Sequence, residues 1–467
     1  MSTLGVDRTR SNARCYKPYP KQDARATAAL RSAHATYKSL EDLGDKAPRG
    51  MIAQRQNPAY RFPLLFFPTK FNEACMKKTS IYVLLLFLIL AVCPAFADVI
   101  ATQGRARLES EDGQMILKLR GTPYERGFQH GVLLKDQIQH NITTFIEGPK
   151  GPFQSRVQAF IEHLPELLSI IPDHFKEEMA GLSDGADIAF DKILILNLFP
   201  EMFHCSGITV SGAASQGELY HVRVLDYSIG KQLQNTAVLQ IVEPDGKIPY
   251  MNVSYAGFIG TITGMNLEKI ALGEIGGLGY GQWNGIPMAF LLREILENAA
   301  NLDEVKSILQ NSPRTCEYYY VFSDGKTKES IGVYATEDQL QFIAPGTSYA
   351  FLPASMPYQA HLVPSDDTQA KFFRQQPSDC LLFTGFPHPE KYPVLLDRIL
   401  ENYGKIDVEV LTEIVKRPVA HPSNLHTAIF QPSALKVWIA HAGANDEPAC
   451  DQPYHAWDLR LLLNTVD

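Results

Sequence analysis

The sequence has few cysteines, no long apolar run and no excess of basic residues, and each shortage excludes a class of protein. Its 467 residues carry 43 Lys and Arg against 51 Asp and Glu, a formal net charge of −8 at pH 7. A nucleic-acid-binding protein usually presents a basic face, so this balance argues against a nucleic-acid partner. Seven cysteines are too few for a disulfide scaffold in a chain of this length.

Sequence motifs for the common cofactors are also missing. The chain has no Walker loop, no Rossmann glycine fingerprint and no zinc-spaced cluster of Cys and His. His421 and His426 stand five residues apart in a loop-like segment and are interpreted as structural rather than metal-binding. We therefore expect neither a cofactor nor a metal ion.

The most apolar stretch of the chain is short. It runs from Ile81 to Val92, follows Met76-Lys77-Lys78 and precedes Ala95-Phe96-Ala97. A charged head, an apolar core of about a dozen residues and an A-x-A end are typical of a secretory signal peptide. A membrane span needs about 20 apolar residues, so no stable membrane anchor is expected. Residues 76–97 are thus predicted to be a signal peptide, and the protein to be secreted or periplasmic.

Residues 1–75 precede this signal, are basic and show no periodic apolar pattern. Signal peptides stand at the start of a chain. The simplest hypothesis is that translation begins at Met76 and that residues 1–75 are a non-native or disordered extension. The alternative is a targeting arm, because the first 40 residues are rich in arginine and poor in acidic residues. Residues 98–467 are expected to form a single domain.

A predicted hairpin contains the candidate catalytic residues. Cys205 precedes a short strand, Ile208–Val210, and a second strand, Leu219–Leu225, runs into Asp226. Paired strands lie about 5 Å apart, so the hairpin brings Cys205 close to Arg223 and Asp226. A guanidinium group favours the thiolate form of a nearby cysteine. The alternative is a small buried strand cysteine beside a surface ion pair.

This cysteine does not require a histidine base. If the bond between His204 and Cys205 is cut, Cys205 carries a free α-amino group with an ordinary pKa of about 8. That amine can act as the base of its own nucleophile, as it does in N-terminal-nucleophile enzymes. Asp226 is then available to orient the arginine or to hydrogen-bond the amine.

The periodicity of apolar residues changes at this cysteine. Helical spacing dominates before Cys205, and a period of two residues, typical of strands, dominates after it. The predicted strands after the hairpin include Phe258–Gly264, and further helices and strands alternate to the C-terminus. The sequence therefore predicts an α+β domain, with a helical segment, 98–204, followed by a nucleophile chain, 205–467.

Four further segments surround the hairpin in a defined order. They are LRGTPYERGFQHGVLLKDQI (Leu119–Ile138), Gly181–Met202, Gly257–Gly277 and Gly285–Leu309. Around a cysteine followed by Arg-x-x-Asp, this order resembles the isopenicillin-N (6-aminopenicillanic acid) acyltransferase family of cysteine Ntn-hydrolases. That family is related to choloylglycine hydrolases and acid ceramidases. The resemblance covers about residues 105–460 and implies an α-β-β-α sandwich of antiparallel sheets flanked by helices.

The resemblance also implies roles for single residues. Cys205 is the nucleophile, and Arg223 and Asp226 fix its thiol and amine. Asn266 matches the family's G-x-N element, whose amide helps form an oxyanion hole. From the residues alone, Asn266 is equally well a turn-forming asparagine.

Two positions depart from the family pattern. His204 stands where the family usually carries glycine before its nucleophile. It crowds the turn needed for self-cleavage, acts as a local base, or is only a partly exposed side chain on the end that is discarded. The strand that starts at Cys316-Glu317 lacks the asparagine found there in relatives. One oxyanion or substrate contact is then supplied differently.

We therefore expect a secreted, autoproteolytic hydrolase that cleaves linear amide bonds through a thioester acyl-enzyme. Its substrate would be a small acylated amine or amide. Its two cleaved chains should stay associated, because the helices before Cys205 have apolar faces with nothing else to cover. One alternative is an acyltransferase that moves the acyl group to an amine acceptor. The other is a catalytically inactive secreted binding protein with the same fold.

Overall fold

The computed structural model describes residues 97–148, 161, 163–198, 204–227, 229–276, 284–315, 318–347, 374–384 and 391–464. The predicted extension, and the predicted signal peptide up to residue 96, lie outside these residues, as do Cys316 and Glu317. In the described part of the chain, no helix is both long and apolar enough to cross a membrane. Residues Cys93–Asp467 form one compact unit.

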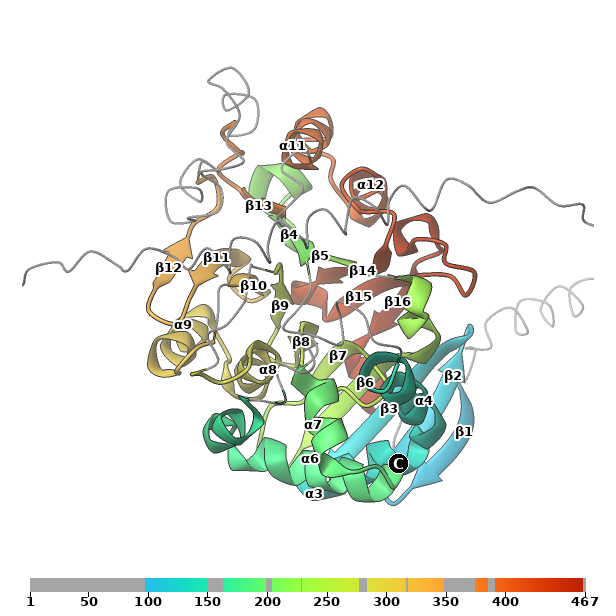
Figure 1. Ribbon diagram of the computed structural model, residues 1–467. Helices are drawn as coiled ribbons and strands as arrows, with labels where there is room; N and C mark the ends of the chain where they lie inside the picture. The colour runs from blue at the N-terminus through green and yellow to red at the C-terminus, as the bar shows by residue number, and fades with distance from the viewer. Residues whose placement is uncertain are drawn as a thin grey trace, which may run out of the picture. The chain divides into compact units, whose positions relative to one another are not determined.

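The strands form two sheets (Figure 1). The larger sheet has ten strands, in the order β1 (Asp98–Gln103), β2 (Ala106–Glu111), β3 (Gln114–Gly121), β6 (Ala237–Pro244), β7 (Tyr250–Tyr255), β8 (Thr263–Asn266), β9 (Ile270–Glu274), β10 (Tyr318–Asp324), β11 (Glu329–Ala335) and β12 (Leu340–Ile343). The smaller sheet has six, in the order β13 (Cys380–Thr384), β4 (His204–Val210), β5 (Tyr220–Asp226), β14 (Asn424–Gln431), β15 (Lys436–His441) and β16 (His455–Asp458).

One pair of strands corrects the prediction of purely antiparallel sheets. β3 and β6 run parallel, from Ile116 opposite Leu239 to Gly121 opposite Pro244, whereas the other described strand pairs are antiparallel. Parallel neighbours need a long crossover connection. The helical segment and the Cys205 hairpin together supply it, because both lie between β3 and β6 in the chain.

The two sheets face each other across a shared core. Polar contacts cross between them at Thr209 Oγ1 and Ser330 Oγ, 2.7 Å apart, and at His221 Nδ1 and Ser323 Oγ, 2.8 Å apart. Apolar side chains from both sheets fill part of the space between them: Ile116, Leu239, Ile241, Met251, Val253, Met265, Ala271, Ala428, Phe430, Val437 and Ile439.

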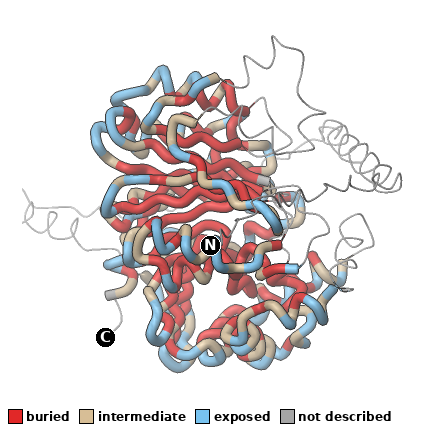
Figure 2. Tube along the Cα trace, turned by 90° about the vertical axis from the view of Figure 1, so that its left-hand side faces the viewer, coloured by how far each residue is buried: buried red, intermediate tan, exposed pale blue. Residues whose placement is uncertain are grey.

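Helices cover the outer faces of both sheets (Figure 2), so the predicted α+β class with its four layers is confirmed. The helices on the larger sheet are α3 (Pro123–Leu133), α4 (Lys135–Asn141), α6 (Asp173–Ala186), α7 (Phe190–Leu198), α8 (Met288–Asn298) and α9 (Leu302–Asn311). Those on the smaller sheet are α11 (Lys391–Glu401) and α12 (Val408–Ile414), and α13 (Leu459–Asn464) follows β16. Shorter helical turns are Ile142–Ile146, Gly212–Ser215, Ile229–Lys231, Leu233–Thr236, Pro432–Ala434 and Ala449–Asp451.

Helix α3 begins with a capping box at Thr122. Thr122 accepts a hydrogen bond from the backbone N–H of Glu125, and the Glu125 side chain accepts one from the Thr122 N–H. This capping box satisfies two backbone donors at the helix start. Glycines then let α3 lie directly against α6, since a Cβ on Gly127 would stand 1.9 Å from the carbonyl oxygen of Glu178.

A buried network of charges ties this helical layer together. Glu178 of α6 accepts hydrogen bonds from Arg126 of α3, at 2.7 Å, and from Arg293 of α8, at 2.6 and 2.9 Å. Arg293 also pairs with Glu297 at 2.9 Å. Burial alone would raise the pKa of Glu178, but the guanidinium groups of Arg293 and Arg126 lower it from 4.5 to about 2. The network thus joins helices that lie on opposite sides of Cys205 in the chain.

Candidate active site

Cys205 stands one residue inside β4, opposite Leu225 of β5. In the same register His204 lies opposite Asp226, and Gly207 lies opposite Arg223. The predicted hairpin is therefore confirmed, although β4 begins at His204 rather than at Ile208. Both strands are covered on two faces, so the Cys205 side chain is only 2% exposed.

The thiol of Cys205 lies beside a buried ion pair. Its Sγ is 3.9 Å from Oε2 of Glu274, the last residue of β9 in the facing sheet. The same carboxylate oxygen accepts a hydrogen bond of 2.9 Å from Nη2 of Arg223. Both side chains of this pair are fully buried. Arg223 and Cys205 thus contact the same carboxylate oxygen, and the ion-pair partner of Arg223 is Glu274 rather than Asp226.

Two glycines make this close approach between the sheets possible. A Cβ on Gly273 would stand 2.8 Å from Cδ of Arg223, so its absence leaves room for the arginine to reach Glu274. A Cβ on Gly207 would stand 2.7 Å from side-chain carbons of Ile275. With no side chain there, the start of β4 lies against the end of β9, and the Cys205 N–H donates to the Ile275 carbonyl at 3.1 Å.

Burial dominates the electrostatics of the thiol. It raises the pKa of Cys205 well above its ordinary value. The guanidinium of Arg223 lowers this pKa, as the sequence predicted, but the carboxylates of Glu274 and Asp226 raise it again. The Cys205 thiol is therefore protonated at neutral pH.

Asp226 belongs to a different set of contacts. Its Oδ2 is 2.5 Å from Nζ of Lys391, the first residue of α11. Its Oδ1 accepts hydrogen bonds from the N–H of His421, at 3.0 Å, and from Nδ2 of Asn424, at 3.4 Å. Residues three apart on a strand point to opposite faces, so Asp226 and Arg223 do not meet. Asp226 is thus held at the helix-covered face of the smaller sheet.

Asn266 lies away from Cys205, so its amide is not placed for the role in an oxyanion hole that the resemblance implies. It ends β8, at the turn into β9, whereas Glu274 stands at the other end of β9. Nδ2 of Asn266 donates to the carbonyls of Leu296, at 3.0 Å, and Ala299, at 2.8 Å, and its Oδ1 accepts from the Ile270 N–H. Both amide hydrogens are therefore used to hold the end of α8 on the sheet.

A row of residues across the smaller sheet was not predicted to be part of the site. Cys205, Leu225, His426 and His441 lie opposite one another in successive strands. Nδ1 of His426 is 2.8 Å from the Tyr255 hydroxyl, and its Nε2 is 3.0 Å from Oγ1 of Thr263. Burial lowers the pKa of His426 well below its ordinary value. Cross-strand neighbours share a sheet face, so this neutral imidazole lies on the same face as the thiol.

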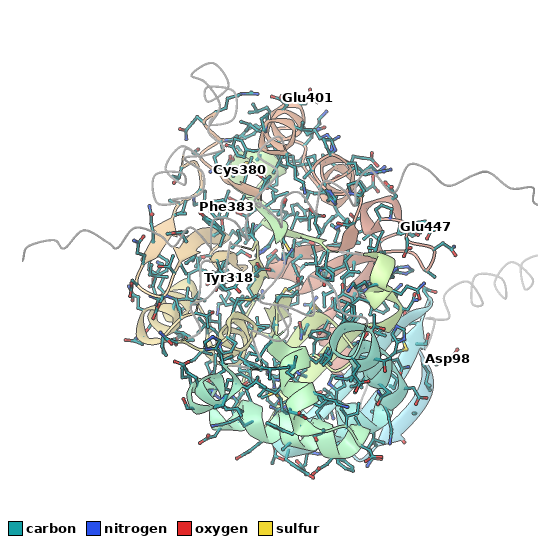
Figure 3. The ribbon with its side chains drawn as sticks, in the orientation of Figure 1. Asp98, Tyr318, Cys380, Phe383, Glu401 and Glu447 are labelled. Carbon is teal, nitrogen blue, oxygen red and sulfur yellow. The ribbon has the colours of Figure 1, made fainter. Side chains whose placement is uncertain are left out.

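No group of three or more His, Cys, Asp or Glu side chains suited to a metal ion occurs among the described residues. Three described cysteines, Cys205, Cys380 and Cys450, are buried free thiols. Cys380 lies on β13 near Phe383 (Figure 3) and pairs with Val210 at the far end of β4. Burial raises the pKa of Cys380, with the Asp379 carboxylate acting in the same direction. Only one end of β4 thus combines a thiol with a buried arginine.

Comparison with known proteins finds one matching family model and several similar curated proteins. Residues 213–341 match the family described as acyl-coenzyme A:6-aminopenicillanic acid acyl-transferase. Protein dcd1A of Dictyostelium discoideum is 28% identical over 364 residues, which cover 70% of this chain and 78% of that protein. Human acid ceramidase is 27% identical over 233 residues, covering 44% of this chain and 57% of its own. The resemblance predicted from the sequence is thus confirmed.

Among solved structures, one similar chain is the N-acylethanolamine-hydrolyzing acid amidase ortholog of Caenorhabditis elegans. It has a TM-score of 0.36 and 14% sequence identity, and it covers 54% of this chain and 99% of its own.

Proposed function

From its match to the acyl-coenzyme A:6-aminopenicillanic acid acyl-transferase family, we propose that this chain is an amidohydrolase with Cys205 as its nucleophile. The observation that carries the proposal is the contact of the Cys205 thiol with the buried Arg223–Glu274 pair, at the start of a strand. A buried ion pair beside a buried thiol is a costly arrangement that packing alone does not require. It supports a role in chemistry at this sulfur atom.

The first reaction of the protein is a cut of its own chain. The Cys205 sulfur attacks the carbonyl carbon of His204, the C–N bond breaks, and the thiol proton passes to the nitrogen. The resulting thioester is opened by water, which leaves a carboxylate on His204, a thiol on Cys205 and a free α-amine. The backbone of His204 belongs to β4 and lies opposite Asp226, so strand pairing holds both sides of the scissile bond.

The cut supplies the base that the uncut chain lacks. The α-amine of Cys205 takes the thiol proton, the thiolate attacks the substrate amide carbonyl, and the protonated amine gives its proton to the leaving nitrogen. Nε of Arg223 is buried and has no hydrogen-bond acceptor among the described residues. This N–H is therefore the donor that the site offers to the developing oxyanion, in place of Asn266.

The proposed substrate is a small acylated amine with a linear amide bond. The acid ceramidase relatives favour an amide of a long acyl chain as the first compound to assay. We propose hydrolysis rather than transfer because, for a secreted protein, water is abundant and acyl-coenzyme A donors are scarce. Secretion or export to the periplasm is part of the proposal and is supported by the signal-like residues 76–97.

The mass spectrum of the purified protein tests this function most directly. We expect two chains, one ending at His204 and one beginning at Cys205, and a thiol-reactive inhibitor attached to Cys205. Active protein that runs as a single chain with residues 204 and 205 still joined would refute the amine as base. Peptides that begin before Met76 in the native protein would refute translation from Met76.

The two alternative functions, an acyltransferase and an inactive binding protein, would give different results. An acyltransferase would convert its acyl-enzyme, in the presence of an added amine, mainly to the new amide rather than to the free acid. An inactive binding protein would leave Cys205 unlabelled by the probe. The buried Arg223–Glu274 pair at the sulfur favours an enzyme over the inactive protein.

A further inference from the structure

A second buried ion pair stands next to the proposed cut, and none of the proposed reaction steps uses it. Lys391 and Asp226 have side chains only 6% and 7% exposed, with Nζ and Oδ2 2.5 Å apart. The carboxylate also accepts from the backbone N–H of His421 and the amide of Asn424. These contacts fill both of its oxygens, and its one described cation is Lys391.

The Lys391–Asp226 pair lies at the strand position of the proposed cut. Asp226 lies directly opposite His204, the residue that ends the first chain after the cut. Lys391 begins α11, the helix that covers this face of the smaller sheet. The pair therefore stands at the strand position where the cut creates two new charges, a carboxylate on His204 and an ammonium group on Cys205.

The charges balance only when Lys391 is counted. In the uncut chain, Asp226 has Lys391 as its cation. After the cut, two carboxylates, those of Asp226 and His204, face two ammonium groups, those of Lys391 and Cys205. Without the lysine, the uncut site would contain a buried carboxylate with no cation, and the cut site would contain one cation for two carboxylates. Both situations are costly in a buried environment.

We propose that Lys391 is a positioning residue for self-cleavage, holding Asp226 in place before the new amine exists and balancing the new His204 carboxylate afterwards. This inference rests on the proposed cut before Cys205. During the attack, negative charge develops on the carbonyl oxygen of His204, the strand partner of Asp226, and the Asp226 carboxylate disfavours this charge. Lys391 offsets this repulsion and so lowers the barrier to the cut.

The test measures the rate at which newly folded single chain becomes two chains. K391M keeps the length of the side chain and removes its charge, whereas K391R keeps the charge. K416M is the matched control, because Lys416 pairs with Glu413 on the exposed side of the same helical layer. We expect K391M to convert about tenfold more slowly than the wild type and K391R within about threefold of it, with K416M unchanged.

A double-mutant cycle shows whether the lysine acts through Asp226. In a D226N background, we expect K391M to change the conversion rate by less than about twofold, because its partner charge is already gone. K391M/D226N also removes both charges of the pair, so it stays folded if K391M alone does not. A K391M effect of equal size in both backgrounds, or conversion of K391M at the wild-type rate, would overturn the inference.

The same experiment distinguishes failure of the proposed self-cleavage from failure of the proposed role of Lys391. A wild-type chain that never becomes two chains, yet is active and labelled at Cys205, refutes self-cleavage and this role of Lys391 with it. A wild-type chain that is cut normally, together with a K391M chain that is cut equally fast, refutes the role of Lys391 alone.

Discussion

Near Cys205, the smaller sheet carries a buried ion pair on each of its two faces, and the two pairs contact different groups. On the face toward the larger sheet, Arg223 and Glu274 meet beside the Cys205 sulfur. On the face toward α11, Asp226 and Lys391 meet beside the backbone of His204. The first pair contacts the thiol; the second, by our proposal, acts on the peptide bond that precedes Cys205. Successive side chains of β5 point to opposite faces of the sheet, so Arg223 and Asp226 form their ion pairs on opposite sides of it. One pair lies beside Cys205 and the other beside His204.

The largest effect is expected from removing the thiol of Cys205, the proposed nucleophile. Cys205→Ala should abolish both self-cleavage and amide turnover while the fold is kept, since alanine fills most of the same space. Cys380→Ala is the matched control, because this free thiol lies on the strand next to β4 but far from Arg223. Turnover is measured with a long-chain acyl amide and cleavage by mass spectrometry. A C205A protein that still hydrolyses the amide would place the nucleophile elsewhere.

The next largest effect is expected from breaking the inner pair. Arg223→Met removes the cation that pairs with the buried Glu274 carboxylate, which should cost about 3–5 kcal/mol of unfolding free energy. It also removes the charge that lowers the pKa of Cys205, so the rate should fall at neutral pH and partly recover at higher pH. Denaturant unfolding and a pH profile of kcat/KM measure the two parts. An equal loss of rate at every pH with a raised KM would instead show that Arg223 binds substrate.

The buried charges of the helical layer do not contact the thiol, so we expect them to affect stability in acid but not the titration of Cys205. The pKa of Glu178 is about 2 in the folded chain, below its ordinary value of 4.5. A carboxyl group with a lowered pKa stabilises the fold above its unfolded pKa, and this contribution is lost as the pH falls from about 4.5 to about 2. We expect a loss of about 3 kcal/mol over that range. Glu178→Gln should flatten this part of the profile and leave the Cys205 titration unchanged.

The smallest expected effect is a shift in the pKa of Cys205, which compares the influence of a carboxylate on each face of the sheet. Glu274→Gln removes a carboxylate that raises the pKa of Cys205, so this pKa should fall. Asp226→Asn should lower it less, because Asp226 acts more weakly on the sulfur than Glu274 does. Thiolate absorbance titrations, taken as differences from C205A, measure both shifts. A larger shift for D226N than for E274Q would reverse the assignment of the two faces.

The parts of the site that the sequence predicted are those encoded locally. Cys205 and Arg223 belong to one hairpin, and alternation along two adjacent strands is enough to bring them together. Glu274 lies on the facing sheet and Lys391 on a helix that begins 165 residues after Asp226. Nothing in their local sequence marks these contacts, because they arise only when the two sheets and the outer helices pack.

The errors have equally specific causes. Asn266 fits a family motif, yet its amide is used to hold the end of α8. The predicted strand Phe258–Gly264 starts only at Thr263, because side chains take the backbone groups that a strand would need. The Gly257 N–H donates to Nε2 of His130, and the Ile259 N–H donates to Oδ1 of Asn197. A residue pattern does not reveal such competition for backbone hydrogen bonds.

The parallel pairing of β3 with β6 has a consequence for the protein after the proposed cut. The first chain would contribute β1, β2 and β3 to a sheet whose remaining strands belong to the second chain, joined along six pairs of residues. Unfolding would then also be dissociation, so its midpoint temperature should rise with protein concentration. The uncut C205A chain unfolds as a single molecule, and its midpoint should not depend on concentration. The proposed cut would thus change the molecularity of unfolding without changing the strand order of the sheet.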